Sequence, residues 1–136
     1  MTNTNSTGIR ALTVRQPWAS LIAFHGKTVE NRTWPTRWRG TLLVHAANTA
    51  DPHHPFNPDQ VTWNQVRGAV IAVTTLEDCH ADDGMCTPWS EDGAFHWELD
   101  HIRPLARPVL CAGRLGLWTL APDVLAQVTA QIGALP

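Results

Sequence analysis

Lysine, paired cysteines and long apolar runs are all scarce in this chain of 136 residues. Lys27 is its single lysine, and no stretch approaches the length of a membrane span or the basic-then-apolar pattern of a secretory signal. Cys79, Cys86 and Cys111 are odd in number and contain no Cys-x-x-Cys pair. We therefore expect reduced thiols in a cytoplasmic protein and neither a membrane segment nor a disulfide framework.

The charge is small in total but uneven along the sequence. The formal net charge is −2, which argues against a protein that binds nucleic acid over its whole surface. Residues 1–50 carry six cations against Glu30 alone, whereas residues 51–136 carry four arginines against eleven acids. We expect an anionic partner, if there is one, to meet the N-terminal part of the chain.

Apolar periodicity predicts two helices. The first covers residues 17–25, where apolar side chains recur at i, i+3, i+4 and i+7 between Pro17 and Gly26. The second begins at Pro122 and carries its aliphatic residues on one side. Both helices are short, so they cannot form the core of the protein by themselves.

Short β-prone runs separated by loops make up most of the remaining chain. The acidic stretch 77–93 and the proline-rich stretch 51–59 are typical of loops. We predict an α+β fold, a small mixed β-barrel with peripheral short helices, as one domain over residues 9–136 that follows a disordered tail, residues 1–8. The predicted strands are residues 41–47, 69–76, 94–99 and 109–120, the last of them broken by glycines.

The stretch from His25 to Gly40, HGKTVENRTWPTRWRG, gathers cations and tryptophans around one acid. In an extended chain Glu30, Arg32 and Trp34 share one face, with Lys27 at the preceding corner. Guanidinium and ammonium groups bind phosphate, tryptophan stacks on bases, and a carboxylate accepts from an exocyclic amine. The alternative is structural: Glu30 simply pairs with a neighbouring cation and the tryptophans fill the core.

The sequence from Leu12 to Ala47 resembles the opening of an ASCH domain (activating signal cointegrator homology), a branch of the PUA-like barrels. Later segments, such as GAVIAVTTLEDC and GRLGLWTL, resemble later strands of that family in the same order. The likeness extends over about residues 10–120. The opening is matched by QPWASLI at Gln16–Ile22, the Lys-x-x-Glu-x-Arg core at Lys27, Glu30 and Arg32, the pairs Thr33–Trp34 and Arg39–Gly40, and a strand bearing His45.

This resemblance implies a five- or six-stranded barrel with a cleft lined by the Gly-Lys-Glu-Arg segment. It also implies a role with RNA or a nucleic-acid component. Within the family, some bacterial members hydrolyse N4-acetylcytidine, others are ribonucleases, and a eukaryotic member binds DNA. The hydrolase uses a lysine, a threonine and a glutamate; Lys27 matches the lysine, whereas Glu30 stands where that enzyme has its threonine.

The leading interpretation is a module that binds nucleic acid, RNA or another single strand, or a modified nucleotide, through a Lys/Glu/Arg/Trp cleft. The alternative is an enzyme on the same cleft, an N4-acetylcytidine-type amidohydrolase or a ribonuclease, with Lys27 as base or nucleophile and Glu30 as proton partner. A third possibility is a protein-binding domain that uses the acidic loop. The predicted site residues are Gln16, Trp18, Lys27, Glu30, Arg32, Trp34, Arg37, Arg39 and His45.

No metal or cofactor is predicted. His53 and His54 lie in a proline-rich loop, and Cys79, His80 and Cys86 lack a paired partner at a spacing typical of zinc sites. His45 could act as a general base in a ribonuclease, although a strand histidine with satisfied hydrogen bonds is the commoner case.

Overall fold

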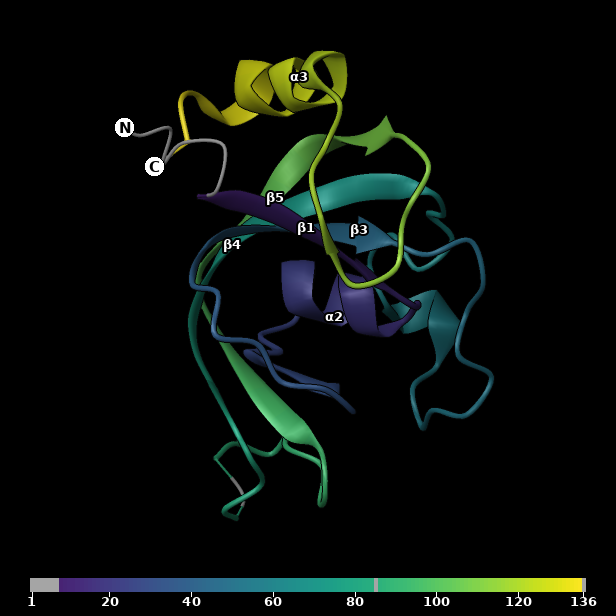
Figure 1. The fold of residues 1–136 in the computed structure, drawn as a ribbon. Coiled ribbons are helices and arrows are strands. Elements are labelled where there is room, and N and C mark those ends of the chain that lie inside the picture. Colours follow the sequence, from purple (N-terminus) through teal and green to yellow (C-terminus); the bar gives the residue numbers. More distant parts are fainter. Residues whose placement is uncertain (1–7, 85, 136) are drawn as a thin grey trace.

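The computed structural model describes residues 8–84 and 86–135, in which six strands form one mixed sheet accompanied by two α-helices (Figure 1). The predicted disordered tail lies outside the described residues except for Gly8, whose carbonyl accepts a hydrogen bond from the Thr41 amide. In sheet order the strands are β2 (Val29–Arg32), β5 (Phe95–Leu110), β4 (Ala69–His80), β3 (Gly40–Ala46), β1 (Ile9–Val14) and β6 (Leu117–Trp118).

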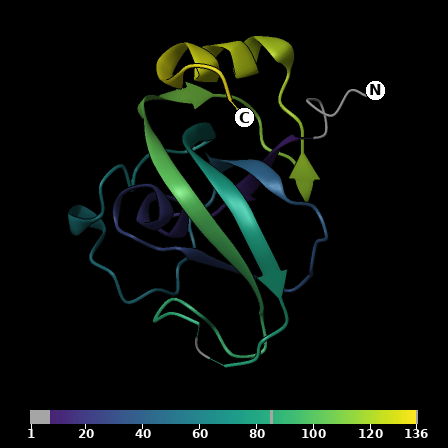
Figure 2. The same cartoon turned by 90° about the vertical axis from the view of Figure 1, so that its left-hand side faces the viewer.

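The sheet curls into a half-barrel, as predicted for a small mixed barrel. β1 and β3 are parallel, and every other neighbouring pair is antiparallel. Figure 2 shows the long strands β4 and β5 running side by side across the molecule. Three register shifts between these two strands mark bulges or irregularities, and bulges increase the local bend of a strand.

Each face of the sheet carries its own hydrophobic core. On the concave face, α2 (Trp18–Phe24) packs its buried residues against β-strand side chains such as Leu42 and Trp97. On the other face, α3 (Pro122–Ile132) inserts Val128 against residues that include Leu43. Leu42 and Leu43 therefore point to opposite faces of β3, as strand alternation predicts.

Both predicted helices are present. α2 starts one residue after Pro17, follows a cis Gln16–Pro17 peptide bond, and ends before Gly26. α3 begins at Pro122 as predicted, and with 11 residues it is too short to cross a bilayer. None of the helices in the described part of the chain has the length and apolarity of a membrane span. The connection between β3 and β4 contains one 3-10 helix, Pro58–Gln60.

The strand boundaries differ from the sequence prediction in several places. β4 continues through His80, so the predicted acidic loop 77–93 begins later than expected. β5 is one strand of 16 residues that includes Pro104 and Pro108, whereas residues 100–108 were not predicted as strand. Proline is tolerated there because β2 pairs only with the first four residues of β5, which leaves that edge open further along.

Two further segments also depart from expectation. The predicted strand 109–120 is mostly a loop, since β5 ends at Leu110 and only the short β6 follows. β1 was not predicted, because a strand with both faces covered shows no clear alternation of polar and apolar residues.

Candidate functional site

A pocket of about 620 Å³ lies where β1 and β3 end side by side. The start of α2, strand β2, Glu91 and the loop that joins β5 to β6 supply the remaining walls. This volume is within the range of small-molecule sites in proteins. The charged residues of the lining are Arg15, Lys27, Glu30, Arg32, Asp51, Glu91 and Arg114.

One wall is a row of three charged side chains centred on Glu30. Its Oε1 lies 3.1 Å from the Lys27 ammonium, and its Oε2 lies 3.0 Å from a guanidinium nitrogen of Arg32. Lys27 is 2 % exposed and Glu30 is 6 % exposed, whereas the Arg32 side chain is partly exposed. Alternation along β2 places Glu30 and Arg32 on one face, as the sequence predicted. The row holds two cations and one carboxylate at the edge of the pocket.

The corner at Gly26 turns Lys27 toward the interior. Gly26 has a φ of +76°, a left-handed conformation that glycine adopts without steric cost. The next amide, that of Lys27, donates to the carbonyl of Leu21 in α2. The ammonium then donates to the Val29 carbonyl and lies 5.7 Å from the centre of the Trp18 ring, within the range of a cation–π contact.

Trp18 is held in place at the mouth of the pocket by Asp51. The indole Nε1–H donates to a carboxylate oxygen of Asp51 at 2.9 Å, and Arg15 lies 3.9 Å from the same oxygen. The hydrogen bond from Trp18, followed by one from the His53 backbone amide and by the charge of Arg15, lowers the pKa of Asp51. Asp51 therefore stays ionised and fixes the orientation of the indole at neutral pH.

His45 is positioned through both of its ring nitrogens. Its Nε2 lies 2.8 Å from the Cys111 carbonyl and must donate to it, and Nδ1 lies 3.3 Å from the Thr13 hydroxyl. The indole of Trp118 donates to that hydroxyl oxygen. Burial lowers the pKa of His45, while the bond to Cys111 opposes the shift. The imidazole is therefore neutral, and its nitrogens are engaged by the protein, which favours the structural interpretation over a general base.

The loop between β5 and β6 closes against His45 at Gly113. A Cβ atom added to Gly113 would lie 2.7 Å from the Thr13 hydroxyl oxygen and 2.8 Å from His45 Cε1. Both distances are shorter than real Cβ contacts, so only glycine allows this approach. The following residue, Arg114, is exposed at the pocket lining and forms no hydrogen bond or ion pair with any of the residues that the structure describes.

The structure brings five of the nine predicted site residues together in the pocket lining: Trp18, Lys27, Glu30, Arg32 and His45. Gln16 is fully buried behind the lining, where its amide bonds to Ser20 and to backbone carbonyls. Trp34 also lies outside the lining, where it packs edge-on against Trp97. Its ring makes a cation–π contact with the Arg32 guanidinium, 5.8 Å from the ring centre.

Arg37 and Arg39, the last two arginines among the predicted site residues, do not line this pocket. Arg39 instead pairs with Asp78 at 3.2 Å and donates to nearby carbonyls. The break at Pro35 carries both arginines away from β2 to another part of the surface, because a loop after β2 does not continue the alternation of the strand.

Seven polar lining residues were not predicted from the sequence. They come from separate segments that only the fold assembles: Thr13, Arg15, Asn31, Asn48, Asp51, Glu91 and Arg114. The pair of glycines that flanks Arg114 at positions 113 and 116 was interpreted as a strand bend, although it also signals a loop that can approach another segment closely. Arg15 follows directly after β1, where binding residues often lie.

No metal centre is indicated in the pocket. Among the described residues, the groups of histidine, cysteine and acidic side chains that are close enough to share an ion all lie outside its lining.

Comparisons with known proteins connect this geometry to a family. Two crystal structures of ZmASCH from Zymomonas mobilis, a serine-to-alanine and a tyrosine-to-phenylalanine variant, share the fold with TM-scores of 0.58 at 14 % identity. They cover 92 % and 90 % of this chain and 96 % and 97 % of their own chains. No curated protein matches the sequence. The ASCH domain profile matches residues 12–107, and the chain therefore belongs to the ASCH domain family.

Proposed function

We propose that the pocket binds one nucleotide unit, either a base within single-stranded RNA or a free modified nucleoside. The observation that carries this proposal is the Lys27–Glu30–Arg32 row, in which Lys27 and Glu30 are buried, on the wall of a pocket of about 620 Å³. A row of donors and acceptors in a concave site of this size suits a polar planar ligand. Membership of the ASCH family supports an RNA-related ligand.

The Watson–Crick edge of a base matches the chemistry of the row. Each oxygen of Glu30 has one partner among the described residues, so a second lone pair remains to accept from an exocyclic amine such as that of cytosine. An ammonium has three donors, of which Lys27 uses one on the Val29 carbonyl and one on Glu30. The third donor can meet a base carbonyl, and the Trp18 ring offers an aromatic surface for stacking.

Two exposed arginines in the pocket lining can bind the phosphate groups of the ligand. The Arg15 side chain is 55 % exposed, and among the described residues its only polar contact is the long one of 3.9 Å to Asp51. Arg114 is exposed and makes no polar contact with the described part of the chain. Phosphate neutralisation by such side chains makes affinity fall as salt rises.

The proposal is tested by titrating the protein into a labelled single-stranded RNA and following fluorescence anisotropy across a salt series. We expect Arg15→Ala and Arg114→Ala each to weaken binding and to reduce the salt slope by about one phosphate contact. Arg107→Ala, which changes an exposed arginine on β5 outside the pocket, serves as the matched control. The proposal fails if neither RNA nor any nucleoside binds at low salt, or if Arg107→Ala weakens binding as much as the pocket variants.

Hydrolysis on the same pocket is a second candidate, favoured by one contact. The Lys27 ammonium and the Glu30 carboxylate face each other at 3.1 Å next to the cavity, an arrangement that suits proton transfer between a base and its partner. The substrates to examine are N4-acetylcytidine and short RNAs. His45 does not support the ribonuclease version, since the protein engages both of its ring nitrogens.

Turnover of each substrate is measured by chromatography for the native protein, for Lys27→Ala and for the control Arg107→Ala. If the pocket is an active site, we expect the native protein and the control to form product, and Lys27→Ala to form none. Product that survives Lys27→Ala would contradict it. Binding without turnover in the native protein leaves the binding proposal intact and rejects the catalytic one.

A further inference from the structure

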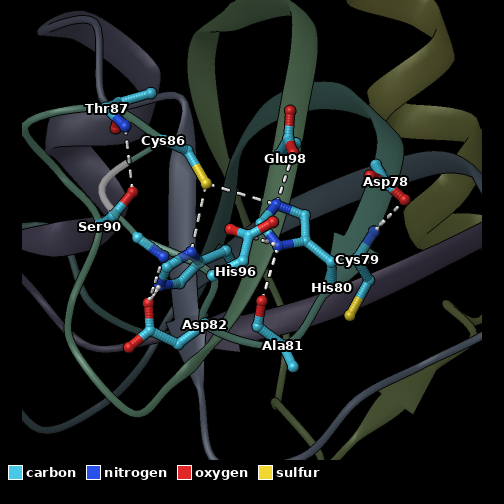
Figure 3. A network of polar contacts seen from close by, with 12 residues as sticks. Asp78, Cys79, His80, Ala81, Asp82, Cys86, Thr87, Ser90, His96 and Glu98 are labelled. Carbon is cyan, nitrogen blue, oxygen red and sulfur yellow. Dashed lines mark hydrogen bonds and ion pairs between the residues drawn. The ribbon is translucent and has the colours of Figure 1, made fainter.

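A cysteine and two histidines converge at the end of the hairpin formed by β4 and β5 (Figure 3), and none of the three lines the pocket. His80 and His96 are paired across the two strands in the sheet register. Cys86, from the intervening loop, places its Sγ 3.3 Å from Nε2 of His80 and 3.3 Å from Nδ1 of His96. In Figure 3 the sulfur lies between the two imidazole rings.

Backbone carbonyls orient both histidines. His96 is fully buried, and its Nε2 lies 2.8 Å from the carbonyl of Glu91, to which it must donate. Its Nδ1 therefore carries a lone pair directed at Cys86. His80 is held in the same way through Nδ1, which lies 2.9 Å from the Ala81 carbonyl, so that Nε2 faces the sulfur. A hydrogen bond from the second nitrogen to a carbonyl is the usual support of a metal-binding histidine.

A carboxylate completes a set of four donors. One donor atom from each of His80, Asp83, Cys86 and His96 can be chosen so that all four lie within 4.8 Å of one another. Tetrahedral zinc with Zn–S near 2.3 Å and Zn–N near 2.0–2.1 Å places neighbouring donors roughly 3.5 Å apart. The two sulfur–nitrogen distances of 3.3 Å agree with that spacing.

We propose that this cluster is a binding site for a borderline divalent transition-metal ion, zinc above all, held by His80, Cys86, His96 and the carboxylate of Asp83. Thiolate and imidazole donors select zinc over magnesium or calcium, which prefer oxygen ligands. In this structure Nε2 of His80 lies 2.7 Å from Oε2 of Glu98 and donates a hydrogen bond to it, so this proton must leave when the nitrogen binds the ion.

From the sequence alone no zinc site was expected here, because Cys79, His80 and Cys86 lack a paired partner at zinc spacing. The missing partner is His96, ten residues beyond Cys86 on the returning strand. Only the register of β4 against β5, which pairs His80 with His96, brings the two histidines together. A spacing of this kind matches no common zinc motif and is found only in the folded chain.

The bound ion would fix one wall of the pocket. The loop that contains Cys86 also contains Trp89 and Glu91, which bond to the side chain of Asn31 on β2. Asn31 and Glu91 both line the pocket. A metal ion bound at the cluster would link Cys86 in this loop to His80 on β4 and His96 on β5. The ion would therefore restrict the motion of the pocket wall that this loop forms.

The test begins with protein stripped of metal by a chelator and titrated with Co²⁺, whose tetrahedral thiolate complexes have characteristic absorption bands. We expect one Co²⁺ per chain with a thiolate-to-metal charge-transfer band, and displacement of Co²⁺ by Zn²⁺. Cys86→Ser removes the band and weakens zinc binding at least tenfold. Cys111→Ser, in which the altered cysteine lies outside the cluster, keeps both.

A second measurement does not depend on any variant. Zn²⁺ is expected to slow alkylation of Cys86 by iodoacetamide while leaving the rate at Cys79 unchanged, as followed by peptide mass spectrometry. The proposal is overturned if the native protein binds no Zn²⁺ or Co²⁺, if Cys86→Ser binds as tightly as the native protein, or if zinc leaves Cys86 alkylation unaffected.

Discussion

The Lys27 ammonium lies 3.1 Å from the Glu30 carboxylate, with both side chains almost completely buried at the edge of the pocket. A buried ion pair contributes little net stability, because removing both charges from water costs about as much as their attraction returns. Replacing one partner lowers the free energy of unfolding strongly, because the other charge stays buried without compensation. The row is therefore a source of defined donors and acceptors, and it makes the fold sensitive to single substitutions at this point.

Lys27→Met tests how strongly the row is coupled to stability. Glu30 would keep only Arg32 as a partner, and we expect the free energy of unfolding to fall by about 3 kcal/mol, the lower end for a broken buried pair. Urea unfolding followed by circular dichroism measures the change. The control is Arg39→Met, which breaks the exposed pair with Asp78 and should cost no more than about 1 kcal/mol. Equal costs for the two variants would contradict a buried, coupled row.

Gly113→Ala tests the close approach of the β5–β6 loop to His45. The added methyl group would overlap the Thr13 hydroxyl and the imidazole, so the loop must move outward. We expect a loss of about 1–3 kcal/mol in the free energy of unfolding, together with weaker ligand binding. Ala112→Ser adds an atom to the neighbouring exposed residue and should change neither quantity. A fully stable Gly113→Ala protein with native affinity would show that the loop is not held against His45.

The neutral state of His45 predicts a pH dependence of stability. Its pKa is lowered below 6.5 in the folded chain, mainly by burial. As pH falls below 6.5, the unfolded chain takes up a proton on His45 that the folded chain does not, so its contribution to stability is complete above that pH and is lost below it. The slope from one such group is at most about 1.4 kcal/mol per pH unit.

Urea unfolding between pH 7.5 and pH 5 measures this effect in the native protein and in His45→Gln. Other titrating groups, including His80, whose pKa is raised chiefly by its bond to the Ala81 carbonyl, act in both proteins and cancel in the difference. We expect the native protein to lose more stability than the variant as pH falls. Parallel curves would mean that His45 titrates normally.

Asn31→Ala tests the attachment of the β4–β5 loop to β2. The side chain of Asn31 donates to the Trp89 carbonyl and accepts from the Glu91 amide, both at about 3 Å. Without these bonds we expect faster hydrogen–deuterium exchange in residues 86–94, with no change in the core strands. Asn57→Ala, in the distant loop before the 3-10 helix, is the control. Unchanged exchange near Glu91 would show that Asn31 does not restrain the loop.

The local pattern of the sequence placed the residues at the centre of the candidate site together, because these residues are close in the chain. Glu30 and Arg32 share a face through strand alternation, and Lys27 precedes them at a glycine corner. Arg37 and Arg39 were misplaced because alternation ends with the strand, after which a loop sets its own direction. The short strands and two short helices already indicated a small mixed barrel, and the ASCH resemblance implied the same architecture; the structure confirms it as a six-stranded half-barrel sheet.

Features that depend on register or on distant segments could not be predicted. Gln16 appeared polar and available, yet the fold buries it against Ser20 and two carbonyls. Arg114 reaches the pocket only because Gly113 fits against His45. His80 and His96 meet only through the pairing of β4 with β5. Each case needs a contact between residues far apart in the chain.

The most direct test of the proposed nucleotide pocket is an NMR titration that follows the indole Nε1–H signals of the seven tryptophans. Trp18→Phe assigns the signal of the one indole that lies in the lining and donates to Asp51. On addition of N4-acetylcytidine, cytidine or a short single-stranded RNA, the account predicts a large shift of the Trp18 signal and little change in that of Trp97, which is fully buried in the core. A ligand that binds without shifting Trp18, or the absence of any shift with all three ligands, would contradict it.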